Sequence, residues 1–177
     1  MKKWISSITA LILIIVASIN NPCNASSNLK SKNDSLAIAQ LLDSFNVAAA
    51  QANFDSYFNF FAEDAIFIGT DATERWNKSN FMIWAKPFFL KKKTWNFKAV
   101  ERHIYLDKTG NMAWFDELLS TQMKICRGSG VLEKVDNQWK IKQYVLSMTI
   151  PNDQVDEVVK LKTPIEDSML ETFLKKK

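Results

Sequence analysis

An acid, a guanidinium and a hydroxyl lie on two neighbouring segments and have the right types for acid/base or binding chemistry. Asp116 lies in segment 112–122, and Arg127 and Ser129 lie in the next segment, 126–135. Residues two apart share a face of a strand, so Arg127 and Ser129 could together meet a carboxylate or carbonyl of a ligand. A carboxylate that is desolvated in a ring-lined cavity can serve as a general base, and Asp116 is the candidate here.

The inward face of segment 112–122 decides this chemistry. Each face carries a ring, an acid and a leucine: Trp114, Asp116 and Leu118 on one, Phe115, Glu117 and Leu119 on the other. Periodicity alone does not choose between them, and we take Asp116 to point inward. The structural alternative is an ion pair between Asp116 and Arg127 across adjacent strands, with Ser129 in an internal hydrogen-bond network.

Aromatic residues are abundant, with 12 Phe and 6 Trp, which predicts a ring-rich core or pocket. Each ring taken singly fits a core, but together they fit an apolar or planar ligand. The polar loop 70–76 either caps the following helix or forms the rim of a cavity. The candidate ligand-binding residues are Tyr57, Asp71, Trp76, Trp84, Trp114, Arg127, Ser129 and Gln143.

Other kinds of site are disfavoured. His103 is the only histidine and there are 2 cysteines, so we expect no metal site and no cofactor. We expect His103 at the surface or an interface, and Cys126 as a buried thiol on a strand. The formal net charge of +4 includes Lys2, Lys3 and a terminal lysine run. The sequence has no basic stripe interleaved with aromatic residues, so we expect no nucleic-acid binding.

The N-terminus has the pattern of an export signal. Lys2 and Lys3 precede a short apolar run at 8–19, so residues 1–25 are predicted to be a cleaved signal peptide. Cys23 could instead carry a lipid, the one route by which we expect membrane attachment, although Pro22 fits a lipoprotein signal poorly. The expected location is the periplasm or cell envelope.

Hydrophobic periodicity divides the rest into helices followed by strands. Polar residues 26–35 read as a linker, with Asp34 or Ser35 capping a helix that runs to about residue 52. Shorter helices are predicted near 54–61 and 78–89, with a short strand at 65–69 between them. Four strands follow at 95–106, 112–122, 126–135 and 139–150. Without βαβ alternation the fold class is α+β, in one domain at 36–151 with a helical extension at 152–177.

Several stretches resemble the SnoaL-like family, small exported bacterial proteins of the nuclear-transport-factor-2-like superfamily. They are residues 67–76, 84–88, 113–117, 126–132 and 139–141. The resemblance implies a cone of three N-terminal helices on a strongly curved antiparallel sheet, with a pocket between them and a homodimer formed through the sheet. The superfamily often has a cavity-facing histidine in its last strand, but the matching residue here is Val145, with Gln143 nearby.

Three functions remain in view because the fold hosts many activities. The first is binding of a small apolar or planar molecule in the conical cavity. The second is an isomerase or hydrolyase that uses Asp116 as base. The third is a protein-interaction module whose cavity is filled by its own side chains.

Overall fold

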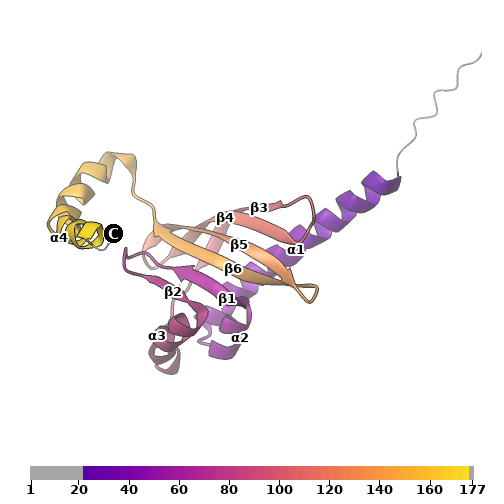
Figure 1. The fold of residues 1–177 in the computed structure, drawn as a ribbon, viewed down its shortest axis with the longest axis horizontal. Helices are drawn as coiled ribbons and strands as arrows, with labels where there is room; N and C mark the ends of the chain where they lie inside the picture. The colour runs from indigo at the N-terminus through magenta and orange to yellow at the C-terminus, as the bar shows by residue number, and fades with distance from the viewer. Residues whose placement is uncertain (1–21, 176–177) are drawn as a thin grey trace, which may run out of the picture.

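A long helix, α1 (Pro22–Ala50), packs on the inner face of a curved six-stranded sheet in the computed structural model, which describes residues 22–175 (Figure 1). Its buried positions recur at three- and four-residue spacing, as an amphipathic helix requires: Ile38, Leu42, Phe45, Ala48 and Ala49. The two small alanines let the end of α1 approach its neighbours closely. Residues 1–21 of the predicted signal peptide lie outside the described residues.

Helix α1 starts well before the predicted position, and residues 26–35 are helical instead of forming an irregular linker. Asp34 is therefore a mid-helix residue and no cap. Its carboxylate accepts a hydrogen bond from Trp139 Nε1 at 3.2 Å and lies 2.7 Å from Lys134 Nζ. These contacts to β6 (Gln138–Met148) and β5 (Lys124–Val135) tie this turn to the sheet, which outweighs the weak helix propensity of its polar residues.

The sheet has the strand order β2-β1-β6-β5-β4-β3. Its strands are β1 (Phe61–Ile68), β2 (Arg75–Asn77), β3 (Lys98–Leu106), β4 (Met112–Thr121), β5 (Lys124–Val135) and β6 (Gln138–Met148). Strands β1 and β6 run parallel, and all other neighbours are antiparallel. The α+β fold class is confirmed, with β3 shorter and β1 longer than the sequence predicts.

Two short helices close one end of the cone with aromatic side chains. Asn53 caps α2 (Phe54–Asn59), and Asn77 caps α3 (Lys78–Leu90) by accepting a hydrogen bond from Asn80 N at 2.9 Å. Both helices bury rings, and Phe58 of α2 lies 5.3 Å from Phe81 of α3, centroid to centroid. Stacked and edge-to-face rings therefore form much of the core between helices and sheet.

The C-terminal extension is helical and lies apart from the other helices (Figure 1). After a short 3-10 turn, η1 (Asn152–Gln154), helix α4 (Val155–Lys175) buries none of its described residues and contains Pro164. Within residues 22–175, no helix combines the length and apolarity that crossing a bilayer requires.

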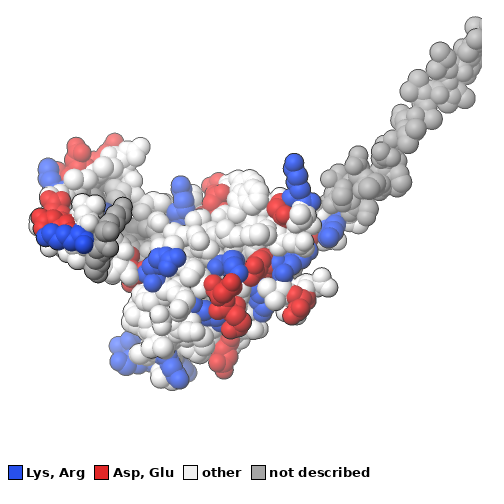
Figure 2. All heavy atoms as spheres, viewed as in Figure 1, with Lys and Arg blue, Asp and Glu red and all other residues white. Residues whose placement is uncertain are grey.

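Charged side chains of both signs mix on the face drawn in Figure 2. Lys142 of β6 lies 2.6 Å from an Asp64 carboxylate oxygen and 3.0 Å from one of Glu133. Ion pairs that solvent reaches contribute little to stability.

Candidate ligand pocket

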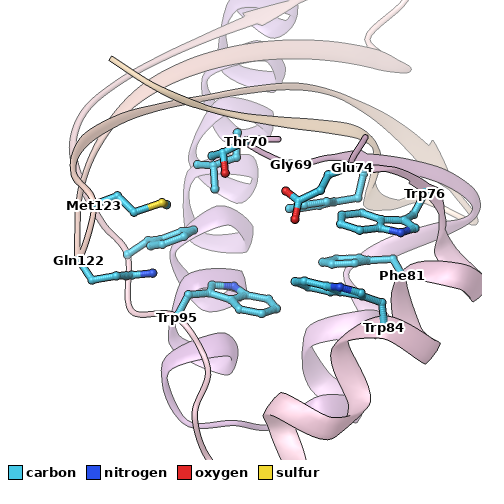
Figure 3. Close-up of a pocket in the computed structure, with 12 residues that line it drawn as sticks. Gly69, Thr70, Glu74, Trp76, Phe81, Trp84, Trp95, Gln122 and Met123 are labelled. Carbon is cyan, nitrogen blue, oxygen red and sulfur yellow. The ribbon is translucent and has the colours of Figure 1, made fainter. Parts of the chain in front are cut away.

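A pocket of about 150 Å³ opens between α3, the β1–β2 loop and the chain that leads into β3 (Figure 3). Six aromatic rings dominate its wall: Phe67, Trp76, Phe81, Trp84, Trp95 and Phe97. The remaining lining residues are Gly69, Thr70, Glu74, Gln122, Met123 and Leu146. A cavity of this size matches an engineered apolar cavity that binds benzene, so a one-ring ligand fits the available space.

The rings on one side of the pocket lie nearly parallel. Trp76 and Phe81 stack with centroids 5.6 Å apart and planes inclined by 18°. Trp84 lies 4.8 Å from Trp76 at an angle of 30°, and Trp95 lies 6.3 Å from Phe81 at 20°. Parallel faces of this kind suit a flat ligand, since offset stacking is a preferred arrangement of aromatic pairs.

Glu74 supplies the pocket's single charged group among the residues described. Its carboxylate points into the space between Thr70 and the tryptophans (Figure 3). One of its oxygens accepts a hydrogen bond from Asp71 N at 3.3 Å. A Cβ at Gly69 would overlap the same oxygen, so the glycine leaves the room that the carboxylate occupies. Glu74 directly precedes β2, Trp76 lies within that strand two residues later, and both side chains line the cavity.

A second acid, Glu117 of β4, is closed off from solvent under α1. Its side chain is 1% exposed, and its Oε2 accepts a hydrogen bond from Arg102 Nε at 2.8 Å. Tyr144 donates to Oε1 at 3.2 Å, and Arg102 also reaches Asp43 at 2.8 Å. Burial raises the pKa of Glu117, and the Arg102 guanidinium offsets part of that rise. The counter-charge of Glu117 thus comes from the protein itself, and Arg102 Nη2 lies 2.7 Å from Oε2 without forming a hydrogen bond.

The expected inward orientation of Asp116 is wrong. Along β4 the buried residues are Ala113, Phe115, Glu117 and Leu119, so Asp116 and Trp114 lie on the sheet's outer face. Asp116 pairs in register with Ser129, and Arg127 pairs with Leu118 and is exposed. Among the described residues neither Asp116 nor Arg127 forms an ion pair.

The remaining candidates divide between core, surface and pocket. Trp76 and Trp84 line the pocket, whereas Tyr57 is buried behind it and stacks on Phe45 at 4.4 Å. Burial raises the pKa of Tyr57, and Trp95 beside it lowers that pKa in part. Asp71 is exposed and folds its own loop by accepting a hydrogen bond from Thr73 N at 2.8 Å. Gln143 lies on the outer face opposite Val131.

A bulge in β6 changes which residue of that strand faces the helices. Val131 pairs with Gln143 but Leu132 pairs with Ile141, so Lys142 is an extra residue. Tyr144 points inward as a result, and Val145 lies on the outer face, away from the cavity-facing position that the resemblance implies. His103 is exposed, as predicted, beside Glu101 at 2.8 Å, and Cys126 is a buried free thiol.

Loop 70–76, which the sequence predicts to be either a helix cap or a cavity rim, supplies Thr70 and Glu74 to the pocket wall, although neither was among the candidate ligand-binding residues. Gln122 was not predicted. Gln122 and Met123 come from the β4–β5 turn, whose position depends on the strand register and carries no local signature.

A family model for the SnoaL-like domain matches residues 38–151, which is more than half of the chain. The chain belongs to the SnoaL-like family. The match agrees with the span of the sequence resemblance and with the sheet and helices described above. No protein among those with curated functions matches the sequence.

Solved structures share the fold at low identity. An NTF2-like protein of unknown function from Pseudomonas putida KT2440 is 13% identical, with a TM-score of 0.59 over 70% of this chain and 92% of that one. A proposed aromatic ring hydroxylase from Novosphingobium aromaticivorans is 15% identical, with a TM-score of 0.58 over 67% and 91%. A proposed dehydratase from Streptomyces avermitilis is 10% identical, with a TM-score of 0.58 over 68% and 99%. The activities proposed for the last two differ, as is common among proteins that share a fold.

Proposed function

We propose that this SnoaL-like domain binds a small planar molecule in the ring-lined pocket. The observation that carries the proposal is the cavity of about 150 Å³ walled by the rings of Trp76, Trp84 and Trp95, with Trp84 inclined by 30° to each of the other two. A module whose cavity is filled by its own side chains would leave no such space. Stacking on exposed ring faces contributes about 0.5–1.5 kcal/mol per ring beyond the burial of apolar area.

The isomerase or hydrolyase alternative loses its proposed base, because Asp116 lies on the opposite side of the sheet from the pocket. Glu117 does not replace it, since Arg102 and Tyr144 occupy its oxygens. Binding is therefore the function that the described residues support best.

A fluorescence titration with toluene, excited at the tryptophans, tests the proposal. We expect saturable binding that Trp84→Ala weakens by about five- to tenfold, in line with the loss of one stacking partner. Trp114→Ala is the matched control, because this tryptophan is half exposed on the outer face, and it should leave the affinity unchanged. Absence of saturation, or equal weakening by both substitutions, would rule out this pocket.

The outer face of the sheet supports a second proposal, a homodimer formed through it. Tyr105 and Trp114 are 45% and 49% exposed and stack on each other at 5.8 Å. The same face carries the acid Asp116 together with Arg127, so two copies can match opposite charges. Light scattering should give a dimer mass for the wild type and a monomer mass for Trp114→Asp. A monomeric wild type would contradict the dimer.

Export through a cleaved signal stays a prediction, because the segment that carries it lies outside the described residues. Intact-mass measurement of protein from its native host should show the loss of about 25 residues. A retained N-terminus would contradict export, and a diacylglycerol on Cys23 would indicate a membrane-anchored lipoprotein in the cell envelope.

A further inference from the structure

The charged side chain in the pocket wall is acidic, and the wall contains no basic one. Of the twelve residues that line it, Glu74 alone is charged, and Thr70 and Gln122 add uncharged polar groups. No lysine, arginine or histidine is among them. A ligand that enters this space meets aromatic rings together with the Glu74 carboxylate, which lies beside Trp76 (Figure 3).

The Glu74 carboxylate has no cationic partner among the residues that the structure describes. Its hydrogen bond from Asp71 N is weak at 3.3 Å and leaves acceptor capacity free. The adjacent Arg75 is exposed and projects from the opposite face of β2, because successive side chains of a strand alternate. Glu117 shows the contrasting arrangement, since Arg102 lies against its oxygens.

We propose that the pocket recognises planar organic cations, such as pyridinium or aromatic ammonium compounds, with Glu74 as the counter-charge and the tryptophans as the stacking surface. This inference rests on the proposed binding function and narrows its ligand class. A cation over the face of a tryptophan is attracted by the ring quadrupole, and the attraction grows as water is excluded. Glu74, beside Trp76, adds a direct charge interaction with the cation.

The same wall disfavours anionic ligands. An anion would have to lose its hydration next to a carboxylate without gaining a basic side chain, which is costly in a largely apolar cavity. Neutral flat molecules would keep the stacking but gain nothing from Glu74. Charge therefore distinguishes ligands that have the same shape.

Toluene and N-methylpyridinium test this point because they have nearly the same size and shape and differ by one charge. Titrations of the wild type, Glu74→Gln and Glu101→Gln, followed by tryptophan fluorescence or calorimetry, separate shape from charge. Glu74→Gln keeps the volume of the side chain and an acceptor for Asp71 N. Glu101→Gln removes an exposed acid on the outer face and is the matched control.

We expect the wild type and Glu101→Gln to bind N-methylpyridinium at least about fivefold more tightly than toluene. Glu74→Gln should weaken that preference, because only the attraction to the ring faces remains, while it retains toluene binding. Equal affinity for both probes in the wild type, or an undiminished preference in Glu74→Gln, overturns the cation inference and leaves the pocket proposal standing. Failure of both probes to bind the wild type overturns the proposed function and this inference together.

Discussion

Two glutamates in this protein lie in apolar surroundings and differ in what meets them. Glu117 is buried under α1 and accepts hydrogen bonds from Arg102 and Tyr144. Glu74 faces a ring-lined cavity and accepts one long hydrogen bond from its own loop. The first carboxylate is neutralised within the fold, whereas the second is left available to a ligand.

The contrast explains why an acid among aromatic rings is a poor guide to function by itself. A buried charge is costly unless it is paired, so the fold supplies a guanidinium wherever a carboxylate is fully enclosed. A half-buried carboxylate beside a cavity can remain hydrated until a ligand arrives. Whether a carboxylate is enclosed by the protein and paired with a cation, more than its residue type, distinguishes a structural acid from a ligand-binding one.

The largest expected effect comes from breaking the enclosed pair. Arg102→Ala should lower the free energy of unfolding by about 3–5 kcal/mol, because it leaves Glu117 buried without its counter-charge. Replacing both partners, as in Arg102→Met with Glu117→Leu, should recover much of that loss. Urea denaturation measures both, and Arg127→Ala on the outer face should change stability by no more than about 0.5 kcal/mol. A mild effect of Arg102→Ala would mean that the pair is not enclosed as described.

A smaller loss is expected where a glycine makes room for the same pair. A Cβ at Gly128 would lie 2.6 Å from the Tyr144 hydroxyl oxygen and 3.0 Å from Glu117 Cγ. Gly128→Ala should therefore cost about 1–3 kcal/mol, the range for overpacking a core. Thermal melts of this variant at neutral pH check the value, and a melting temperature equal to the wild type's would argue against the crowding.

Gly69→Ala is the corresponding change at the pocket, and its effect should appear in binding more than in stability. The new methyl group would displace the Glu74 carboxylate, which is the end of a flexible side chain. We expect less than about 1 kcal/mol of destabilisation but a reduced preference for N-methylpyridinium over toluene. A large drop in stability with an unchanged preference for N-methylpyridinium would indicate that Glu74 stabilises the fold and does not bind the ligand.

The smallest effect lies in the turn between β3 and β4, which belongs to neither site. Thr109 and the backbone of Met112 donate hydrogen bonds to Asp107 and lower its pKa from 3.8 to about 2. The stability that this carboxylate contributes is present above pH 3.8 and is lost as the pH falls through about 2. Asp107→Asn should thus lower the melting temperature slightly at pH 6, and the difference should vanish towards pH 2. A constant difference would contradict the lowered pKa.

The fold could be predicted because its signals are local. The structure changes from helices to strands near residue 94, as the periodicity predicts. The family model covers the stretches that carry the resemblance. The early start of α1 could not be predicted, because Asp34 is held by Lys134 and Trp139 from the far end of the chain. Polar composition there favoured a linker, and tertiary contacts decided otherwise.

The site was harder to predict because the two faces of β4 look alike in sequence. The missing signal lies on β5, where Gly128 and Gly130 pair with Glu117 and Phe115. Glycines opposite large residues indicate that those large residues crowd the inner face. This pattern would have predicted that Asp116, Arg127 and Ser129 lie on the outer face. That reading requires the β4–β5 register, which depends on contacts between strands and is not a local property.

The indole N–H signals of the tryptophans test ligand binding in the pocket most directly, because they report each ring separately in one two-dimensional NMR titration. With N-methylpyridinium, we expect saturable shifts for Trp76, Trp84 and Trp95, which line the pocket. Trp114 on the outer face and Trp139 beside Asp34 should not move. Shifts centred on Trp114, or none at the three pocket tryptophans, would contradict the claim that this pocket binds the ligand.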